Sequence, residues 1–301
     1  MTVLITGATG LIGQEIVKQC HDKGIKVHYL TTSKSKLSTE EHYKGFYWNP
    51  RANEIDHFCF EGVDAIINLV GASISKRWTE DYKKVILNSR TETAALLLKT
   101  AKLYNYNIKQ IVSASAIGIY TSSLVHYYEE TNTEVSESFL GKVVHQWEAA
   151  VDEFKSIDCK VAKIRIGLVL AKDGGALPQM VKPISYGVGA AFGSGKQWQS
   201  WIHLKDLAAL FIFAVEEQFE GVYNGVAPNP VSNEELTKIA AGILNRPLLL
   251  PNIPEFAMKI ILGEMHILLF ESQRVSSQKI EAEGYVFKYA NIQPALEALL
   301  H

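Results

Sequence analysis

The sequence contains few cysteines, and their spacing does not match the usual cysteine-based sites. Among its 301 residues there are three, Cys20, Cys59 and Cys159, which lie far apart and form no Cys-x-x-Cys pair. An odd number of widely spaced cysteines indicates neither a disulfide framework nor a zinc site, and reduced, buried thiols are the default. We therefore expect no metal, no disulfide and a cytoplasmic protein.

Long apolar runs and a strong excess of one charge are also missing. No apolar run approaches the ~20 residues that a membrane span needs, and the first predicted strand begins so near Met1 that no signal peptide is expected. The formal net charge is −2 and no polybasic tail occurs, so neither nucleic acid nor a membrane is an expected partner. The composition, with 47% hydrophobic and 21% charged residues, is ordinary for a globular protein. The expected partner is a small-molecule substrate, and the oligomeric state is left open.

A glycine-rich turn near the N-terminus is the most informative motif in the chain. The apolar run Val3–Thr6 ends in a turn with the spacing GxxGxxG, and a helical pattern of apolar residues follows. Glycines at this spacing allow a sharp turn, close approach of the backbone to a pyrophosphate and close packing of the helix on the strand. An ordinary strand-to-helix turn is the alternative, but the flanking strand and helix favour a dinucleotide site. Its expected cofactor-binding residues are Gly7, Thr9, Gly10, Leu11, Ile12 and Gly13.

Strand-like and helix-like segments alternate along the rest of the chain. This order predicts an α/β fold of the Rossmann type, which is a doubly wound, mainly parallel sheet with helices on both faces and a smaller C-terminal substrate lobe. We expect residues 1–168 to form the dinucleotide-binding domain, residues 200–228 to return to its sheet, and residues 169–301 to form the substrate lobe with a C-terminal helical segment. A long helix is predicted from about Thr79 to Tyr104, and strands are predicted at Val27–Thr31, Phe46–Trp48, Ala65–Val70, Lys160–Ile166 and Gly221–Asn224.

The segment after the second predicted strand lacks the carboxylate that NAD-binding Rossmann units use to hold the ribose 2′-hydroxyl. It reads TTSKSK from Thr31 to Lys36, and its hydroxyls and two lysines suit a 2′-phosphate. The segment therefore favours NADP(H), with Thr32, Ser33 and Lys34 as ligands. A solvated basic loop, with NAD(H) as the cofactor, is the alternative, since an arginine would match phosphate geometry better.

These motifs resemble the extended short-chain dehydrogenase/reductase family, whose first turn reads TGxxGxxG. In that family a small-residue turn after the fourth strand passes the cofactor ribose, and the catalytic serine lies at the end of the fifth strand. The matching segments here are NLVGA, from Asn68 to Ala72, and SASAIGIY, from Ser113 to Tyr120. The resemblance implies Ser115 as the catalytic serine and Ser113 as second choice, whereas a serine that only satisfies backbone groups is the alternative. The further cofactor contacts that it implies are Leu69, Gly71, Ala72, Ser113 and Arg165.

The family's YxxxK pair, which moves a proton, is absent. Phe139 and Val143 stand where the tyrosine and the lysine should be, and none of the 13 tyrosines has a lysine four residues later. Neither replacement can transfer a proton, so an enzyme would need another donor. Tyr120, shortly after the fifth strand, is the donor that we expect, and a ring packed beneath the loop is the alternative.

Taken together, the motifs are similar to an atypical subgroup whose members are called epimerase family proteins and carry an extra C-terminal helical segment. They include TGATGLIG, NLVGASISKRW, SASAIGIY and GSGKQWQSWIH, and they run through nearly the whole chain. The resemblance implies an NADP(H)-binding fold and an unassigned substrate. The candidate substrate contacts are Arg77, Trp78, Gln197, Trp201 and His203.

Three functions are compatible with the sequence. The first is an oxidoreductase or epimerase-like enzyme with a non-standard proton donor, which the motif in the substrate lobe favours. The second is a binding protein that senses the redox state of NADP(H) without turnover. The third, a nucleotide-sugar epimerase, ranks last because it needs the missing tyrosine.

Overall fold

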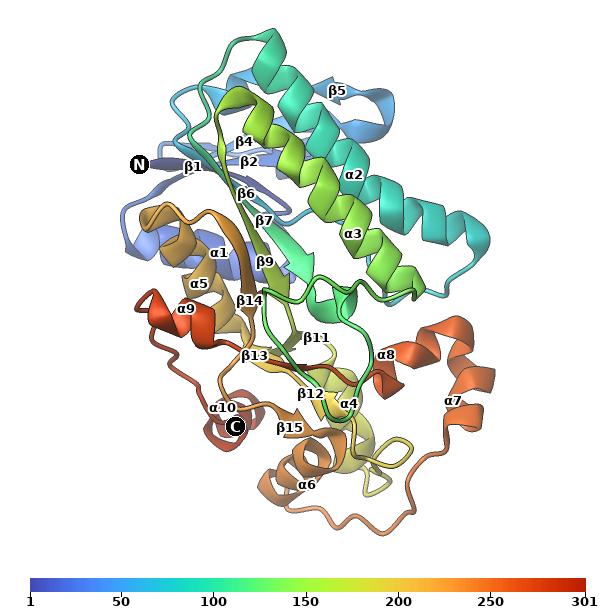
Figure 1. The fold of residues 1–301 in the computed structure, drawn as a ribbon. Helices are drawn as coiled ribbons and strands as arrows, with labels where there is room; N and C mark the ends of the chain where they lie inside the picture. The colour runs from blue at the N-terminus through green and yellow to red at the C-terminus, as the bar shows by residue number, and fades with distance from the viewer.

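The computed structural model describes residues 1–301, and its central sheet has the strand order β14-β9-β7-β6-β1-β2-β4-β3 (Figure 1). Seven of these strands pair in parallel, whereas β3 and the short β5 pair antiparallel with β4. The predicted doubly wound α/β fold is therefore confirmed. The strands of this sheet are β1 (Thr2–Thr6), β2 (Lys26–Thr31), β3 (Thr39–Glu40), β4 (Tyr43–Asn49), β5 (Glu54–Ile55), β6 (Ala65–Asn68), β7 (Gln110–Ala116), β9 (Lys160–Ile166) and β14 (Gly221–Gly225).

The central strands are apolar on both faces because helices cover both faces of the sheet. All of β6 and four of the five residues of β1 are buried, and Ile5 lies beside Ile67 in the parallel register. After β1 the chain builds β2 and β4 on one side, and then crosses to β6 on the other side of β1. This reversal is the switch point at which such sheets bind ligands, outside the carboxyl ends of the strands. The glycine-rich turn follows β1 at this edge.

Two pairs of helices cover the sheet. Helices α1 and α5 pack side by side on one face, and α2 and α3 pack side by side on the other (Figure 1). The Thr79 hydroxyl caps α2 by accepting a hydrogen bond from the Tyr82 backbone N–H, and Tyr104 ends the helix. The predicted helix from Thr79 to Tyr104 is thus confirmed with both residues as caps. The bounds are α1 (Leu11–Asp22), α2 (Glu80–Leu103), α3 (Phe139–Asp152) and α5 (Leu204–Glu216).

The later part of the chain builds a smaller unit beyond the carboxyl ends of the main strands (Figure 1). It has its own core of 13 buried hydrophobic residues around Trp201. Residues 169–301 do not all belong to it, because β14 returns to the edge of the main sheet, as predicted, and Ile280 and Tyr285 pack in the main core. Its elements are β10 (Leu168–Ala171), β11 (Gly174–Gly175), α4 (Leu177–Ser185), β12 (Trp198–Gln199), β13 (Trp201–His203), β15 (Val231–Ser232), α6 (Asn233–Ile243), α7 (Glu255–Leu262), α8 (Ile267–Phe270), β16 (Arg274–Val275, paired with β8, Tyr127–Tyr128) and α10 (Ile292–Leu300). Helix α9 (Gln278–Ala282), which carries Ile280, packs against β14 of the main sheet.

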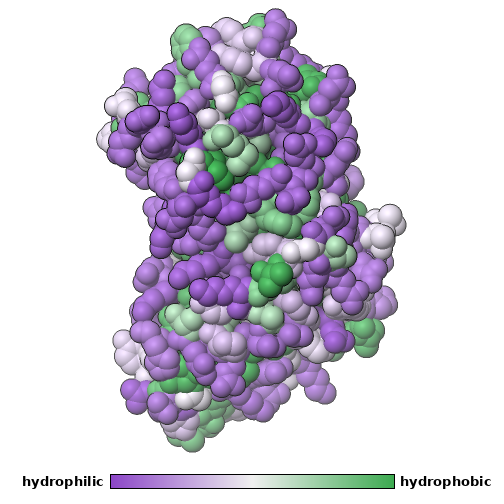
Figure 2. Space-filling model, turned by 90° about the vertical axis from the view of Figure 1, so that its left-hand side faces the viewer, coloured by the Kyte–Doolittle hydropathy of each residue, from purple (hydrophilic) through white to green (hydrophobic).

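The surface offers no sign of a bilayer-spanning element. None of the helices combines the length and the apolar character that crossing a membrane requires. The face in Figure 2 is mostly hydrophilic, and the hydrophobic residues on it form separate groups. Scattered apolar side chains of this kind are normal on a protein surface.

Candidate functional site

The glycine-rich turn has the geometry that the spacing of its glycines predicts. Gly7 adopts a positive φ of 74°, and its carbonyl accepts a hydrogen bond of 2.9 Å from the Gly10 backbone N–H. A Cβ at Gly13 would lie 2.2 Å from the Gly7 carbonyl oxygen, so only glycine allows α1 to pack this closely on the turn. No side chain caps the start of α1 at Gly10. The N-terminus of α1 therefore keeps N–H groups that an anion can accept.

A cavity of about 800 Å³ opens at this turn, and we refer to it as the glycine-turn cavity. It is lined from the carboxyl ends of four neighbouring strands: Gly7 and Thr9 follow β1, Thr31 ends β2, Trp48 and Asn49 end β4, and Val70 to Ala72 follow β6. Residues of α2 complete the wall, with Ser89 accepting a hydrogen bond of 2.8 Å from the Ala72 backbone N–H. The cavity thus extends across the strand ends on both sides of the switch point. Its position is that of a dinucleotide in folds of this class.

Arg51 is a residue of this cavity that sequence reasoning missed. It lies in the short helical turn Pro50–Ala52 directly after β4, and it lines the same cavity as Thr32. The two residues meet because β4 pairs with β2 in parallel, so that their carboxyl ends lie side by side. The only signal in the sequence was an arginine immediately after a predicted strand. Arg51 supplies the guanidinium that the segment after β2 lacks.

Not every predicted cofactor contact lines the glycine-turn cavity. Ser33 and Lys34 lie outside it, with the Lys34 ammonium 5.1 Å from the centre of the Tyr47 ring. Ser113 is fully buried, donates to the Ala114 carbonyl and accepts from the Asn68 side chain. Predicted contacts that also do not line it are Gly10, Leu11, Ile12 and Gly13, which form the turn and the start of α1, and Leu69, which packs against Gly7.

A second cavity of about 210 Å³ lies at the carboxyl ends of β7 and β9, and we refer to it as the Glu271 cavity. Its walls come from the end of β7 and the residues after it, from α3, from the segment that joins β9 to β10, and from β12 and the residue after it. Glu271 itself lies in the segment that follows α8. Eleven of the 18 residues that line the cavity are hydrophobic, among them Leu140, Val143 and Val144 of α3. The cavity therefore reaches Val143, at the predicted lysine position, but not Phe139, at the predicted tyrosine position, and its α3 wall is apolar.

Two titratable side chains line the Glu271 cavity, Arg90 and Glu271. The Arg90 guanidinium donates to the carbonyl oxygens of Ile86 (2.7 Å) and Ala72 (3.3 Å) and pairs with no carboxylate. Burial lowers the pKa of Arg90 to about 10. Ser89 lines one cavity and Arg90 the other, so the two cavities adjoin at this point of α2.

Glu271 is half-buried, and its nearest polar partner is an amide rather than a cation. The Gln273 side chain donates a hydrogen bond of 3.3 Å to the Glu271 carboxylate. Burial raises the pKa of Glu271 above its ordinary value, although the hydrogen bond from Gln273 acts in the opposite direction. A carboxyl in this setting keeps its proton at higher pH than an ordinary glutamate.

The predicted catalytic residues Ser115 and Tyr120 line neither cavity, and their catalytic role stays a prediction. The Ser115 hydroxyl donates to Glu148 Oε1 at 2.5 Å, and the Arg165 guanidinium forms two hydrogen bonds to the same carboxylate, at 2.8 and 3.0 Å. Tyr120 is fully buried, donates to Asn224 Oδ1 at 2.8 Å and accepts from Arg165 Nη1 at 3.0 Å.

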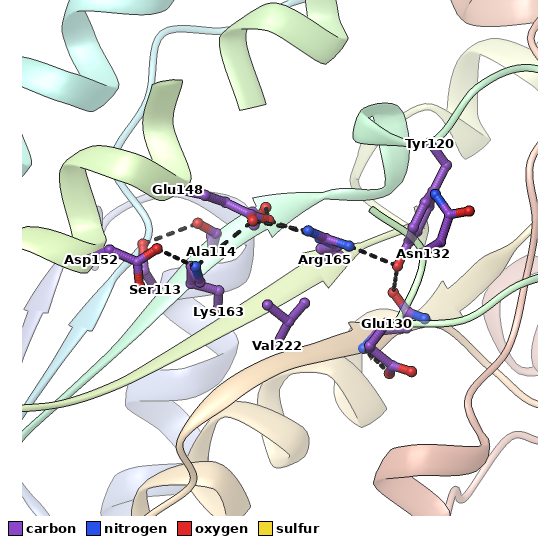
Figure 3. A network of polar contacts seen from close by, with 12 residues as sticks. Ser113, Ala114, Tyr120, Glu130, Asn132, Glu148, Asp152, Lys163, Arg165 and Val222 are labelled. Carbon is purple, nitrogen blue, oxygen red and sulfur yellow. Dashed lines mark hydrogen bonds and ion pairs between the residues drawn. The ribbon is translucent and has the colours of Figure 1, made fainter. Parts of the chain in front are cut away.

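Figure 3 shows Arg165 lying between Glu148 and Tyr120 in this buried network. The network forms because α3 covers the end of β7 and brings Glu148 onto it. The hydroxyl and the phenol are then used to satisfy buried charges. Arg165, predicted as a cofactor contact, belongs to the same network and also lines neither cavity.

The predicted substrate contacts are structural residues or lie at the surface. Trp78 and Trp201 are buried, and their indole N–H groups donate to the carbonyl oxygens of Ile74 and Asn229. Arg77 is exposed and lines neither cavity. In the motif around Trp201, the residues that line the Glu271 cavity are Trp198, Gln199 and Ser200.

Gln197 and His203 hold the smaller unit together. The Gln197 amide donates to the carbonyl oxygens of Phe192 and Leu269. His203 is the N-cap of α5, accepting a hydrogen bond of 3.0 Å from the Lys205 backbone N–H. Burial lowers the pKa of His203 to about 4, so the ring is neutral and can accept this bond.

Comparison with known proteins agrees with the fold and the glycine-rich turn. Residues 3–226 match the model of the NAD dependent epimerase/dehydratase family. The chain belongs to this family. Residues 253–299, which include Glu271, match a domain of unknown function, DUF1731. The predicted resemblance to epimerase family proteins with an extra C-terminal segment is confirmed.

Relatives cover the whole chain. Epimerase family protein SAR0825 of Staphylococcus aureus is 34% identical over 301 residues, which are 99% of this chain and 98% of the relative. The chloroplastic SDR39U1 homolog of Arabidopsis thaliana is 37% identical over 307 residues, which are 100% of this chain and 87% of the relative.

Solved structures show the same architecture. A crystal structure of human epimerase family protein SDR39U1 (isoform2) with NADPH has a TM-score of 0.87 and 28% identity, and the match covers 99% of each chain. The UDP-glucose 4-epimerase of Thermus thermophilus in complex with NAD matches with a TM-score of 0.78 at 18% identity, covering 100% of this chain and 98% of that one. The second likeness concerns the fold alone.

Proposed function

We propose that this chain binds NADP(H) in the glycine-turn cavity and acts as an oxidoreductase on a small substrate in the adjoining Glu271 cavity. The observation that carries the proposal is the arrangement of two cavities that meet at Ser89 and Arg90, both at the carboxyl ends of the parallel strands. When bound, the cofactor supplies a nicotinamide ring that gives or takes a hydride.

The residues of the glycine-turn cavity fit a phosphorylated dinucleotide. The open N-terminus of α1 after Gly10 suits the pyrophosphate, since its N–H groups have no side-chain cap. Thr32 and Arg51 suit the 2′-phosphate, because a hydroxyl and a guanidinium are strong donors and no carboxylate follows β2. The similar human protein was crystallised with NADPH, which supports the same preference here.

The Glu271 cavity favours a small and partly apolar substrate. Its volume of about 210 Å³ is below the roughly 300–1,000 Å³ of sites that enclose drug-sized ligands. Leu140 and Val143 exclude water from one wall, while Arg90 and Gln273 offer hydrogen-bond donors. A nucleotide sugar is a poor fit to such a volume, and the tyrosine that its epimerisation needs is absent. We therefore infer a small carbonyl compound or alcohol as the substrate class.

Binding titrations test the cofactor assignment. Calorimetry with NADPH and with NADH should give the tighter binding for NADPH in the wild type. Arg51→Gln should weaken NADPH binding by about five- to tenfold through loss of a charge-assisted hydrogen bond, and should leave NADH binding unchanged. Arg246→Gln, at an exposed arginine far along the chain, is the matched control. Equal affinities for the two cofactors would contradict the preference, and absence of binding would contradict the site.

A cofactor sensor is the second candidate, and the apolar residues at the YxxxK positions favour it. Absorbance at the nicotinamide band in the presence of small aldehydes, ketones and alcohols separates the two functions. Substrate-dependent oxidation or reduction supports the enzyme. Cofactor-dependent binding of a partner without any such change supports the sensor.

A further inference from the structure

The acid–base chemistry of the Glu271 cavity has to come from residues outside α3. On α3 the cavity is lined by Leu140, Val143, Val144 and Trp147, none of which can give up a proton. The titratable groups that line it are Arg90, from α2, and Glu271, from the DUF1731 segment. A guanidinium does not release its proton near neutral pH, so the carboxyl is the group that can transfer one.

Glu271 is held in place by the backbone on both sides of it. Its N–H donates to the Ile267 carbonyl at 2.8 Å, which closes the end of α8. The next residue, Ser272, is bound to a loop that is distant in the sequence: its N–H donates to Ser122 Oγ and its hydroxyl donates to the Ser123 carbonyl. These bonds join the segment to the loop after β7, which also borders the cavity. A fixed carboxyl is what a proton donor requires.

The surroundings of Glu271 favour its protonated form. The Gln273 amide is its hydrogen-bonding partner among the side chains, and no lysine, arginine or histidine forms an ion pair with it. Burial in the largely apolar cavity raises the pKa of Glu271. The same pattern, a carboxyl kept neutral by an apolar setting, occurs in general acids of known enzymes.

The opposite charge in the cavity is equally unpaired. Arg90 hydrogen-bonds only to backbone carbonyls, and its guanidinium lies 5.1 Å from the centre of the Trp147 ring. The Trp147 indole N–H is buried without any hydrogen-bond partner. The Arg90 guanidinium, which pairs with no carboxylate, is therefore the donor on this wall that suits an acceptor oxygen of a bound molecule.

Arg90 also takes over the place of the missing lysine. Trp147 follows Val143 by one turn of α3, and both line the cavity, so the guanidinium above Trp147 lies on the wall that a lysine at 143 would reach. Arg90 and Glu271 do not pair with one another although they line the same cavity. Space for a ligand therefore separates the cation from the acid.

We propose that Glu271 is the catalytic acid of this chain and that Arg90 is a positioning residue that holds the oxygen-bearing end of a small carbonyl substrate. The proposal rests on the proposed function. In the direction of reduction, the carbonyl carbon gains a hydride from reduced nicotinamide, which is thereby oxidised, and the π electron pair moves to the substrate oxygen. That oxygen takes the Glu271 proton as the carboxyl O–H bond breaks. The carboxylate, which is only half-buried, regains a proton from solvent.

Unfolding without cofactor gives a first test that does not depend on turnover. Because the pKa of Glu271 is raised in the folded state, the wild type loses stability relative to Glu271→Gln as pH rises through that pKa. The Tm difference between Glu271→Gln and wild type should therefore grow as pH rises from below the ordinary glutamate pKa of 4.5 and level off above the raised pKa of Glu271. Glu137→Gln, at an exposed glutamate just before α3, should show no such trend. A difference that does not change with pH would contradict the protonated carboxyl.

Steady-state kinetics with a panel of small aldehydes and ketones give the second test. Glu271→Gln should lower kcat by about 10²-fold or more while leaving the NADPH affinity unchanged. Formate should partly restore turnover to Glu271→Ala, since it can replace the missing acid. Arg90→Gln should mainly raise the KM for the carbonyl compound, and Arg90→Lys should recover part of the loss. Glu137→Gln remains the control.

The outcomes separate the two proposals. Wild-type protein that fails to bind NADPH would refute the proposed function and this inference with it. NADPH binding without reduction of any carbonyl in the panel would leave the cofactor site in place and overturn the acid. Turnover in Glu271→Gln at the wild-type rate and with the wild-type pH profile would overturn it as well. Loss of turnover in Glu271→Gln, with formate rescue of Glu271→Ala, supports it.

Discussion

Removal of the Glu148 carboxylate is expected to be among the most destabilising single changes in the chain. The carboxylate is buried and accepts hydrogen bonds from Arg165 Nε, Arg165 Nη2 and the Ser115 hydroxyl. Burial alone would lower the pKa of Arg165, but the bonds to Glu148 hold that pKa above its ordinary value. Glu148→Ala would thus leave a charged guanidinium in the interior with the Tyr120 oxygen as its remaining partner.

The expected loss of stability can be estimated from other buried ion pairs. Breaking such a pair by removing one partner costs about 3–5 kcal/mol, because the other charge stays buried and uncompensated. Native proteins have about 5–15 kcal/mol of stability in all. With about 2–4 °C of Tm for each kcal/mol in a chain of this size class, Glu148→Ala should lower Tm by about 10 °C.

Thermal and urea unfolding measure this loss, with Glu137→Gln as an exposed control expected to stay within about 0.5 kcal/mol. Ser115→Ala and Tyr120→Phe should each cost about 1 kcal/mol, as single hydrogen bonds do, and leave the NADPH affinity unchanged. A Tm for Glu148→Ala within 2 °C of the wild type, with ~2 °C being the effect of less than 1 kcal/mol, would refute the reasoning. A selective loss of NADPH binding in Ser115→Ala would return that serine to the cofactor site.

Three further predictions follow from packing and burial. Gly13→Ala should lower Tm and abolish NADPH binding, because the new Cβ would lie 2.2 Å from a backbone oxygen of the turn, whereas Gly242→Ala, with nothing within 4 Å, should be neutral in both assays. The thiols should not react with a disulfide reagent at pH 8 until the chain is unfolded, since burial raises the pKa of Cys20 and Cys159 to about 12. Rapid labelling of the native protein would contradict this. His203→Asn should reduce the loss of Tm between pH 7 and pH 4. The reason is that the pKa of His203 is lowered to about 4 in the folded protein, so the unfolded chain takes up the proton first as pH falls. A loss of Tm equal to that of the wild type would count against the role of His203 as a cap.

The architecture was predictable because its signals are local. The strands of a parallel sheet are buried on both faces, so β6 appears in the sequence as an unbroken apolar run. The ends of α2 were likewise predicted from the sequence, at Thr79 and Tyr104. The glycine-rich turn needs glycine at Gly7 and Gly13 for steric reasons that involve only neighbouring residues.

The side chains that line the cavities were predictable only in part, because strand order decides them. Arg51 and Thr32 are 19 positions apart in the sequence, and they line one cavity because β4 pairs with β2. Ser115 does lie at the end of a central strand, as predicted. Its hydroxyl meets Glu148 because α3 packs over that end, and a helix–strand contact of this kind leaves no local mark in the sequence.

The position of Glu271 in a cavity was even harder to predict, since this residue follows a short apolar helix and belongs to no motif. Its place in the cavity depends on a chain segment that docks through Ser272 onto the loop after β7. The apolar residue at 143 and the carboxyl at 271 are nevertheless physically linked, because both line one cavity. A lysine at 143 would bring a second cation into that cavity and would lower the pKa of Glu271. With valine at 143, Arg90 is the cation that lines the cavity, and it forms no ion pair with Glu271. The apolar residue at 143 thus helps to keep the pKa of Glu271 raised, as the proposed proton transfer requires.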